Sequence, residues 1–202
     1  MSALDERLRA LLNTEGYEPS ELVALGRPAF ERVLLALERK VMLTIPGKSS
    51  ELDGRAYEDG LQAAIAAFAA EDMARVLAEL VARKWTAEQI ALSGVARVKD
   101  ARVVPFLETA LASREPSTRR SAVGFLGVQR DPRAVAALLG ALKDRSSDVR
   151  GAAVDALAES GDARAIEPLE ALAAKPARSS YLAARAREAI GKIRRRARSP
   201  KR

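Results

Sequence analysis

The sequence predicts an all-α fold, a right-handed α-solenoid of stacked helical hairpins that follows a degenerate helical N-terminal cap. Three observations predict it. A 31-residue repeat occupies the second half of the chain, apolar residues recur at helical spacing, and no segment alternates apolar and polar residues as a strand would. The chain has 202 residues, of which 48% are hydrophobic, so it is long enough to bury a sizeable core.

The N-terminal cap is expected to span residues 1–70 and to consist of helices. The predicted helices are Leu4–Asn13, Pro28–Leu43 and Arg55–Ala70. The second of these is strongly amphipathic, with apolar residues at helical spacing: Phe30, Val33, Leu34, Leu37 and Val41. A loop over Ile45–Gly54, which contains Pro46, Gly47 and two serines, should separate the last two helices.

A first, weak repeat is expected over residues 72–99. It pairs a helix over Asp72–Arg83 with a second helix over Thr86–Arg97. Thr86 and Gln89 have the spacing of a capping box, and Trp85 and Ile90 have that of a hydrophobic staple. The only tryptophan of the chain therefore has a structural explanation.

Three further repeats are expected at about 100–130, 131–161 and 162–193. Each begins with an aspartate, 31 residues after the last, and a leucine keeps the same phase: Asp100, Asp131 and Asp162, then Leu107, Leu138 and Leu169. The aspartate should cap the first helix of each repeat, with Pro132 at the first helical position. In the last repeat a two-residue insertion shifts the phase, so that Ala186 and Ile190 replace Ala153 and Leu157. One hairpin cannot bury both of its apolar faces, so the copies should stack.

The pattern Asp-x-Arg-Ala-Val…Leu…Asp-x-x-Val-Arg-x-x-Ala-x-x-Ala-Leu resembles the HEAT-like repeats named after phycobilisome lyases. Residues 131–161 are the closest match, residues 100–192 carry it well, and residues 71–99 carry it weakly. The resemblance implies that the turn aspartate and the second-helix arginine are structural partners. It therefore assigns Arg119 and Arg150 to the framework, and it implies a fold far more than a function.

The net charge of +7 belongs to the C-terminus. The last eleven residues hold seven Lys and Arg and no acid, whereas residues 1–191 hold 27 of each sign. Residues 194–202 are predicted to form a basic, disordered tail. Ser199-Pro200 ends any helix, so the distal part of the tail should be disordered. The tail either contacts an anionic partner or merely solubilises the chain and favours a helix C-terminus. Its cations are Arg194, Arg195, Arg196, Arg198, Lys201 and Arg202.

The composition argues against catalysis. The chain has no Cys and no His, which excludes thiolate nucleophiles, His-dependent triads and Cys- or His-ligated metals. The paired acids fit helix starts and exposed helix faces better than acid–base chemistry: Asp5/Glu6, Glu58/Asp59, Glu71/Asp72 and Glu167/Glu170. Asp155 is the only acid in the repeats that an enzyme hypothesis would use, and no aromatic residue lies in phase beside it. The composition still permits a Mg²⁺ or glycosidase site made of Asp and Glu alone, but we expect no enzyme, no cofactor and no metal.

The second helices of stacked hairpins share one concave surface, which is the expected binding face. Its positions not needed for packing are Gln89, Ser93, Arg120, Gly124, Gly151, Asp155, Ala184 and Glu188. A nucleic-acid groove would repeat Lys or Arg there, and only Arg120 does so. The sequence therefore predicts a non-enzymatic scaffold or adaptor that binds a partner protein. The alternative is a nucleic-acid-binding solenoid that uses the basic C-terminal repeats and tail.

The chain shows no secretory signal at its N-terminus and no apolar run near the ~20 residues of a membrane span. We therefore expect a soluble, cytoplasmic protein. The oligomeric state stays open, because an acidic N-terminal end and a basic C-terminal end permit head-to-tail association without requiring it.

Overall fold

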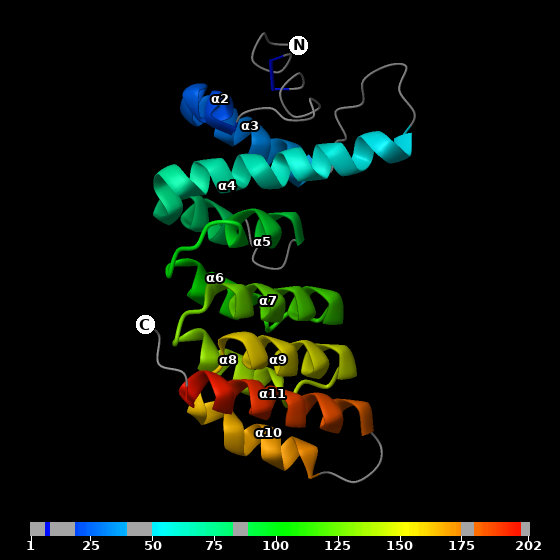
Figure 1. The fold of residues 1–202 in the computed structure, drawn as a ribbon. Helices are drawn as coiled ribbons and strands as arrows, with labels where there is room; N and C mark the ends of the chain where they lie inside the picture. Colours follow the sequence, from blue (N-terminus) through cyan, green and yellow to red (C-terminus); the bar gives the residue numbers. More distant parts are fainter. Residues whose placement is uncertain (1–6, 9–18, 40–49, 83–88, 175–179, 199–202) are drawn as a thin grey trace. The chain divides into compact units, whose positions relative to one another are not determined.

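The computed structural model describes residues 7–8, 19–39, 50–82, 89–174 and 180–198 (Figure 1). Within these ranges all regular secondary structure is helical, which confirms the all-α prediction. The chain forms two compact units, residues 1–98 and residues 99–202. The hairpin predicted over residues 72–99 falls in the first unit up to residue 98, and the predicted boundary between cap and repeats at residues 70 and 71 stays a prediction.

The described helices of the N-terminal unit are α2 (Pro19–Ala24), α3 (Gly26–Arg39), α4 (Ser50–Ala82) and α5 (Gln89–Ala96). The amphipathic stripe of α3 is buried at Ala29, Phe30, Val33 and Leu34, as the apolar spacing predicts. Gly26 has a φ of 68° between α2 and α3, a left-handed conformation that glycine adopts without strain. The capping box, Trp85 and most of the first predicted helix lie outside the described residues.

Helix α4 joins two helices that the sequence predicts separately. It runs from Ser50 to Ala82 with a kink at Asp72, where φ is −140° and ψ is 80°. The Asp72 carboxylate accepts a hydrogen bond from the backbone N–H of Arg75 at 3.1 Å, so Asp72 caps the second half of α4. The predicted break at this aspartate is confirmed, but the chain crosses it as a kink. Residues 50–54, predicted as loop, are helical.

The C-terminal unit is a stack of three helical hairpins. They are α6 (Val103–Ala110) with α7 (Pro116–Gln129), α8 (Ala134–Ala141) with α9 (Ser147–Ser160), and α10 (Ile166–Ala173) with α11 (Ser180–Arg198). Helix α9 packs against both α7 and α11 (Figure 1). The three leucines in phase, Leu107, Leu138 and Leu169, are fully buried. In the last hairpin Ala186 and Ile190 are buried, as the shifted phase predicts.

The Asp-x-Arg motif that begins each of the last two repeats connects it to the repeat before. Asp131 accepts hydrogen bonds from the backbone N–H of Arg133 at 2.8 Å and from its guanidinium at 2.6 Å. The same guanidinium donates to the carbonyl of Ala101 in the preceding repeat at 3.2 Å, and Arg164 donates to the carbonyl of Pro132 at 2.9 Å. The prediction that Asp131 caps the first helix is wrong in detail. Helix α8 begins at Ala134, and Asp131 caps the turn that leads into it.

A second contact between repeats joins Arg119 of α7 to Asp144 in the turn after α8. The Arg119 guanidinium donates hydrogen bonds to both carboxylate oxygens of Asp144, at 2.7 and 2.8 Å. Arg119 is only 4% exposed. It also donates to the carbonyls of Ser113 and Arg114. Arg150 repeats these carbonyl contacts one hairpin later, through Asp144 and Arg145. Both arginines are framework residues, as the family resemblance implies.

These ion pairs make the stability of the C-terminal unit depend on pH. Hydrogen bonds from the arginine side chains hold the pKa of four carboxyls below the ordinary value: Asp100, Asp131, Asp144 and Asp162. Because their folded pKa values lie below the unfolded value of about 3.9, their stabilisation is complete above that pH. It is lost as the pH falls through the folded values. We expect the free energy of unfolding, measured in urea, to fall between about pH 5 and about pH 2.5.

The substitution Asp144→Asn should lower stability at neutral pH and weaken this acid dependence. Asp148→Asn provides the control, since Asp148 is exposed and makes no ion pair within the described residues. It should retain the wild-type pH dependence. An unchanged acid dependence in Asp144→Asn would contradict the assignment.

Two glycines of α7 should respond oppositely to alanine. A Cβ on Gly127 would lie 2.8 Å from the Cβ of Ala156 in α9, whereas a Cβ on Gly124 would meet nothing within 4 Å. Gly127→Ala should destabilise by about 1 to 3 kcal/mol because it overpacks the contact between helices. Gly124→Ala should stabilise by about 0.5 to 1 kcal/mol because alanine favours the helix. Urea unfolding of both variants tests this, and a shift in the same direction for both would contradict it.

Candidate interaction surfaces

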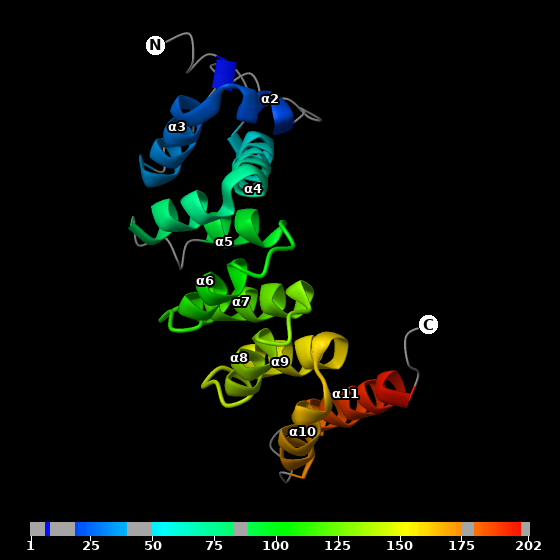
Figure 2. The same cartoon turned by 90° about the vertical axis from the view of Figure 1, so that its left-hand side faces the viewer.

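The second helices of the C-terminal unit, α7, α9 and α11, follow one another along it (Figure 1, Figure 2). We call their solvent-exposed side the second-helix face. On α7 it presents Arg120, Gly124 and Val128, which are spaced four residues apart and therefore share one side of the helix. Val128 is 56% exposed. Arg120 makes no ion pair within the described residues. This strip of α7 is open, with an apolar side chain at one end and a cation at the other.

Gly151 does not belong to the exposed part of this face, so that prediction is wrong. It is buried, and a Cβ there would lie 3.0 Å from Nη1 of Arg185 on α11. Arg185 crosses over this glycine to pair with Asp155, with Nε 3.0 Å from Oδ1. The Arg185 guanidinium also lies 5.2 Å from the ring centroid of Tyr181, a side chain that is 72% exposed. The glycine thus makes room for an arginine of the next repeat.

The predicted acids of the face are exposed, but they are paired. Asp155 binds Arg185, and Glu188 lies 3.7 Å from Lys192 on the next turn of α11. Lys192 also reaches Glu159 of α9 at 3.0 Å, and this hydrogen bond lowers the pKa of Glu159 and raises that of Lys192. Cations and anions on α9 and α11 therefore neutralise one another across the helix contact.

Two predicted residues, Gln89 and Ser93, lie on α5 of the N-terminal unit. Ser93 is half-buried, and the side chain of Gln89 lies outside the described residues. The described second-helix face therefore consists of C-terminal residues alone.

The predicted tail begins too early. Helix α11 continues to Arg198, so residues 194–198 are helical, because their side chains find partners on neighbouring helices. Arg194 pairs with Glu170 of α10 at 2.7 Å. Arg196 donates to three carbonyls at the C-terminus of α9, those of Ala158, Glu159 and Gly161. Such a cation satisfies carbonyls that the helix leaves without partners and complements its dipole.

The remaining cations of this segment differ in their surroundings. Arg195 and Arg198 are exposed and make no ion pair within the described residues. Lys201 and Arg202 lie outside these residues. Of the four tail cations that are described, two therefore have a structural role and two are available to a ligand.

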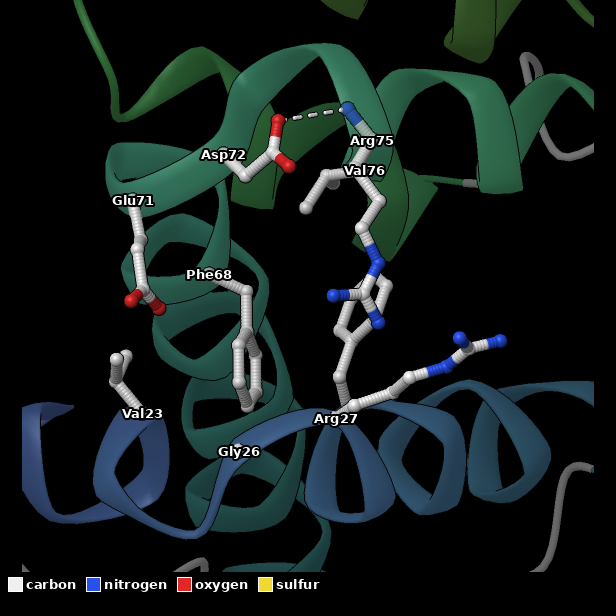
Figure 3. A pocket seen from close by; sticks show the side chains of 9 residues that line it. Val23, Gly26, Arg27, Phe68, Glu71, Asp72, Arg75 and Val76 are labelled. Carbon is white, nitrogen blue, oxygen red and sulfur yellow. Dashed lines mark hydrogen bonds between the residues drawn. The ribbon is translucent and has the colours of Figure 1, made fainter.

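The N-terminal unit contains a cavity that the sequence did not predict. It has a volume of about 410 Å³ and lies beside the kink of α4 (Figure 3). No residue spacing in the sequence predicts that the residues lining this cavity lie close together. The signals that existed were Phe30 in an apolar stripe and the acid pair Glu71/Asp72, and both have ordinary structural explanations. The lining residues are Val23, Gly26, Arg27, Phe30, Phe68, Glu71, Asp72, Arg75 and Val76.

Comparison with known families supports the repeat assignment. Residues 104–191 match the family model of HEAT repeats. Over these residues the C-terminal unit is similar to HEAT repeats. No curated protein matches the chain significantly. HEAT repeats commonly mediate protein interactions.

Neither a metal site nor a membrane span occurs in the described part of the chain. No group of three or more Asp or Glu side chains there is arranged to hold a metal ion. No described helix is long and apolar enough to cross a membrane.

The roles of the C-terminal arginines can be separated by a matched pair of substitutions. Arg196→Ala should lower the thermal midpoint by roughly 5 °C, because the last carbonyls of α9 lose their donor. Arg198→Ala, two residues later on the same helix, should leave the midpoint within about 2 °C. Equal midpoints in a thermal scan monitored by circular dichroism would show that Arg196 does not stabilise α9.

Proposed function

We propose that this protein is a non-enzymatic scaffold or adaptor that binds a partner protein through the second-helix face. The open strip of α7 carries the proposal. Arg120, Gly124 and Val128 form a surface that no other described side chain covers, since Gly124 has nothing within 4 Å of a built Cβ. On α11, which packs against α9, lie Tyr181 and Arg185, of the residue types that dominate binding energy at protein interfaces.

The electrostatics of the face favour a protein over a nucleic acid. A duplex is bound mainly through Lys and Arg that neutralise phosphates. Here Arg185 and Lys192 are already paired with Asp155 and Glu159, and Arg120 is the unpaired cation of the described α7 strip. A surface with an apolar strip and a rim of compensated charges is typical of a protein–protein interface.

Binding of nucleic acid is the second candidate, and a specific observation supports it. Arg195 and Arg198 are exposed at the C-terminal end of α11 without ion-pair partners in the described residues, and Lys201 and Arg202 follow them in the sequence. Both candidates are tested by the same set of variants.

The decisive comparison replaces one of two equally open glycines by arginine. Gly124 lies on the second-helix face and Gly140 on α8, and a Cβ on either meets nothing within 4 Å. Gly124→Arg should abolish capture of the partner protein from a nuclease-treated lysate, because the long side chain fills the strip. Gly140→Arg should capture it as the wild type does. Matching circular dichroism spectra would establish that both variants fold.

Nucleic-acid binding predicts a different pattern. An added arginine at residue 124 would leave binding to a random duplex unchanged or strengthen it, and replacement of the unpaired Arg195 and Arg198 by alanine would weaken it. Binding should then fall by at least about tenfold between 50 mM and 200 mM salt. Loss of partner capture in both glycine variants, or in neither, would overturn the proposed face.

The proposal also includes the subtype of the repeat, the absence of catalysis and the location in the cell. A phycobilisome-lyase type of HEAT-like repeat fits the Asp-x-Arg motif, whose contacts recur in successive repeats. A non-catalytic role in the cytoplasm fits a chain with neither Cys nor His.

A further inference from the structure

The cavity of the N-terminal unit has a wall from each of three helices. Val23 comes from α2, Arg27 and Phe30 come from α3, and Phe68 and Arg75 come from α4 on either side of its kink. Its volume of about 410 Å³ falls within the roughly 300–1,000 Å³ of small-molecule sites. The kink turns the second half of α4 away from the first, so the space beside Asp72 is left unfilled.

Arg75 presents an unpaired cation to this space. Its guanidinium lies 5.6 Å from the ring centroid of Phe30 and is half-buried. It makes no ion pair and no side-chain hydrogen bond within the described residues. Its backbone N–H is held by Asp72 at 3.1 Å, which fixes the first turn from which the side chain extends. A guanidinium stacked on an aromatic ring, with its donors free, is suited to a carboxylate.

Glu71 presents the opposite charge from the other side of the cavity. Figure 3 shows its carboxylate beside Val23, with Phe68 between it and the Arg75 side chain. It is exposed and, within the described ranges, forms no ion pair. The two charges face the same space without neutralising one another, in contrast to the paired charges of the C-terminal unit.

The floor between them is apolar. Phe30 and Phe68 lie with ring centroids 4.9 Å apart and are 2% and 7% exposed. Val23 and Val76 complete this part of the lining. A ligand that fits offers a carboxylate to Arg75, a cation to Glu71 and an apolar group to the phenylalanine rings.

We propose that this cavity binds a small zwitterion with an apolar side chain, namely a free apolar α-amino acid. Its carboxylate binds the Arg75 guanidinium, its ammonium group binds Glu71, and its side chain packs on Phe68. An inorganic phosphate fits less well, because Glu71 and Asp72 at the rim repel a dianion. This site is independent of the second-helix face, and neither proposal rests on the other.

The test is isothermal titration of the full chain with L-leucine and with three probes that each lack a feature. L-leucinamide lacks the carboxylate, N-acetyl-L-leucine lacks the ammonium group, and inorganic phosphate lacks the apolar body. We expect L-leucine to bind with a Kd below about 10 mM and each probe to bind at least about tenfold more weakly.

Two substitutions connect binding to the named side chains. Arg75→Gln and Glu71→Gln should each weaken L-leucine binding by at least about tenfold, because each removes one charge-assisted hydrogen bond. Their matched controls are Arg32→Gln on α3 and Glu21→Gln on α2, exposed residues that do not line the cavity. The controls should bind as the wild type does. Glu71 is exposed, so Glu71→Gln is expected to fold. It keeps the test valid even if Arg75→Gln is destabilised by loss of the contact between Arg75 and Phe30.

Three results would overturn the proposal. The first is absence of heat and of a thermal shift with L-leucine up to about 10 mM. The second is equal affinity for L-leucine and for the amide, the acetylated form or phosphate. The third is unchanged binding by Glu71→Gln. None of these results affects the glycine comparison on α7, which reports on the other unit.

Discussion

The close packing of one second helix on the next is the constraint on which the C-terminal unit depends. A single hairpin exposes too much apolar surface to be stable alone, so each repeat needs its neighbour. The small residues of these helices, Gly127 and Ala156 at the contact between α7 and α9, let the backbones approach until no extra methyl group fits. The fully buried leucines of the first helices, such as Leu138, then complete the core behind this contact.

Arginine connects the repeats wherever their polar backbone groups meet. Arg119 closes the turn of the next hairpin, and Arg133 and Arg164 each donate to a carbonyl of the preceding repeat. Arg145 adds a contact to the carbonyl of Arg114, at an offset of one repeat. A planar guanidinium with five donors can hold a carboxylate and a carbonyl together, which lysine cannot do. Much of the basic composition of the chain is therefore structural, and net charge is a weak guide to its ligand.

The N-terminal unit follows a different principle. Its longest helix, α4, is bent at Asp72, and the bend leaves a cavity with Glu71 and Arg75 uncompensated at its sides. In the repeats, by contrast, charges of opposite sign that approach one another form ion pairs, as Arg185 does with Asp155. The proposed ligand site of the N-terminal unit therefore differs from the repeats in one feature, namely unpaired charges around an apolar floor.

The sequence alone determined most of the helical segments, the 31-residue repeat, its shifted phase in the last hairpin and the buried leucines, because these follow from local periodicity. It did not predict α2 or the helical conformation of residues 50–54. It also indicated the break at Asp72 and the framework role of Arg119. Only the tertiary structure decided that Gly151 is covered by Arg185, that α11 continues to Arg198 because Arg194 and Arg196 find partners, and that Phe30 and Phe68 enclose a cavity. Each of these depends on side chains far apart in sequence, whose contact no spacing along the chain records.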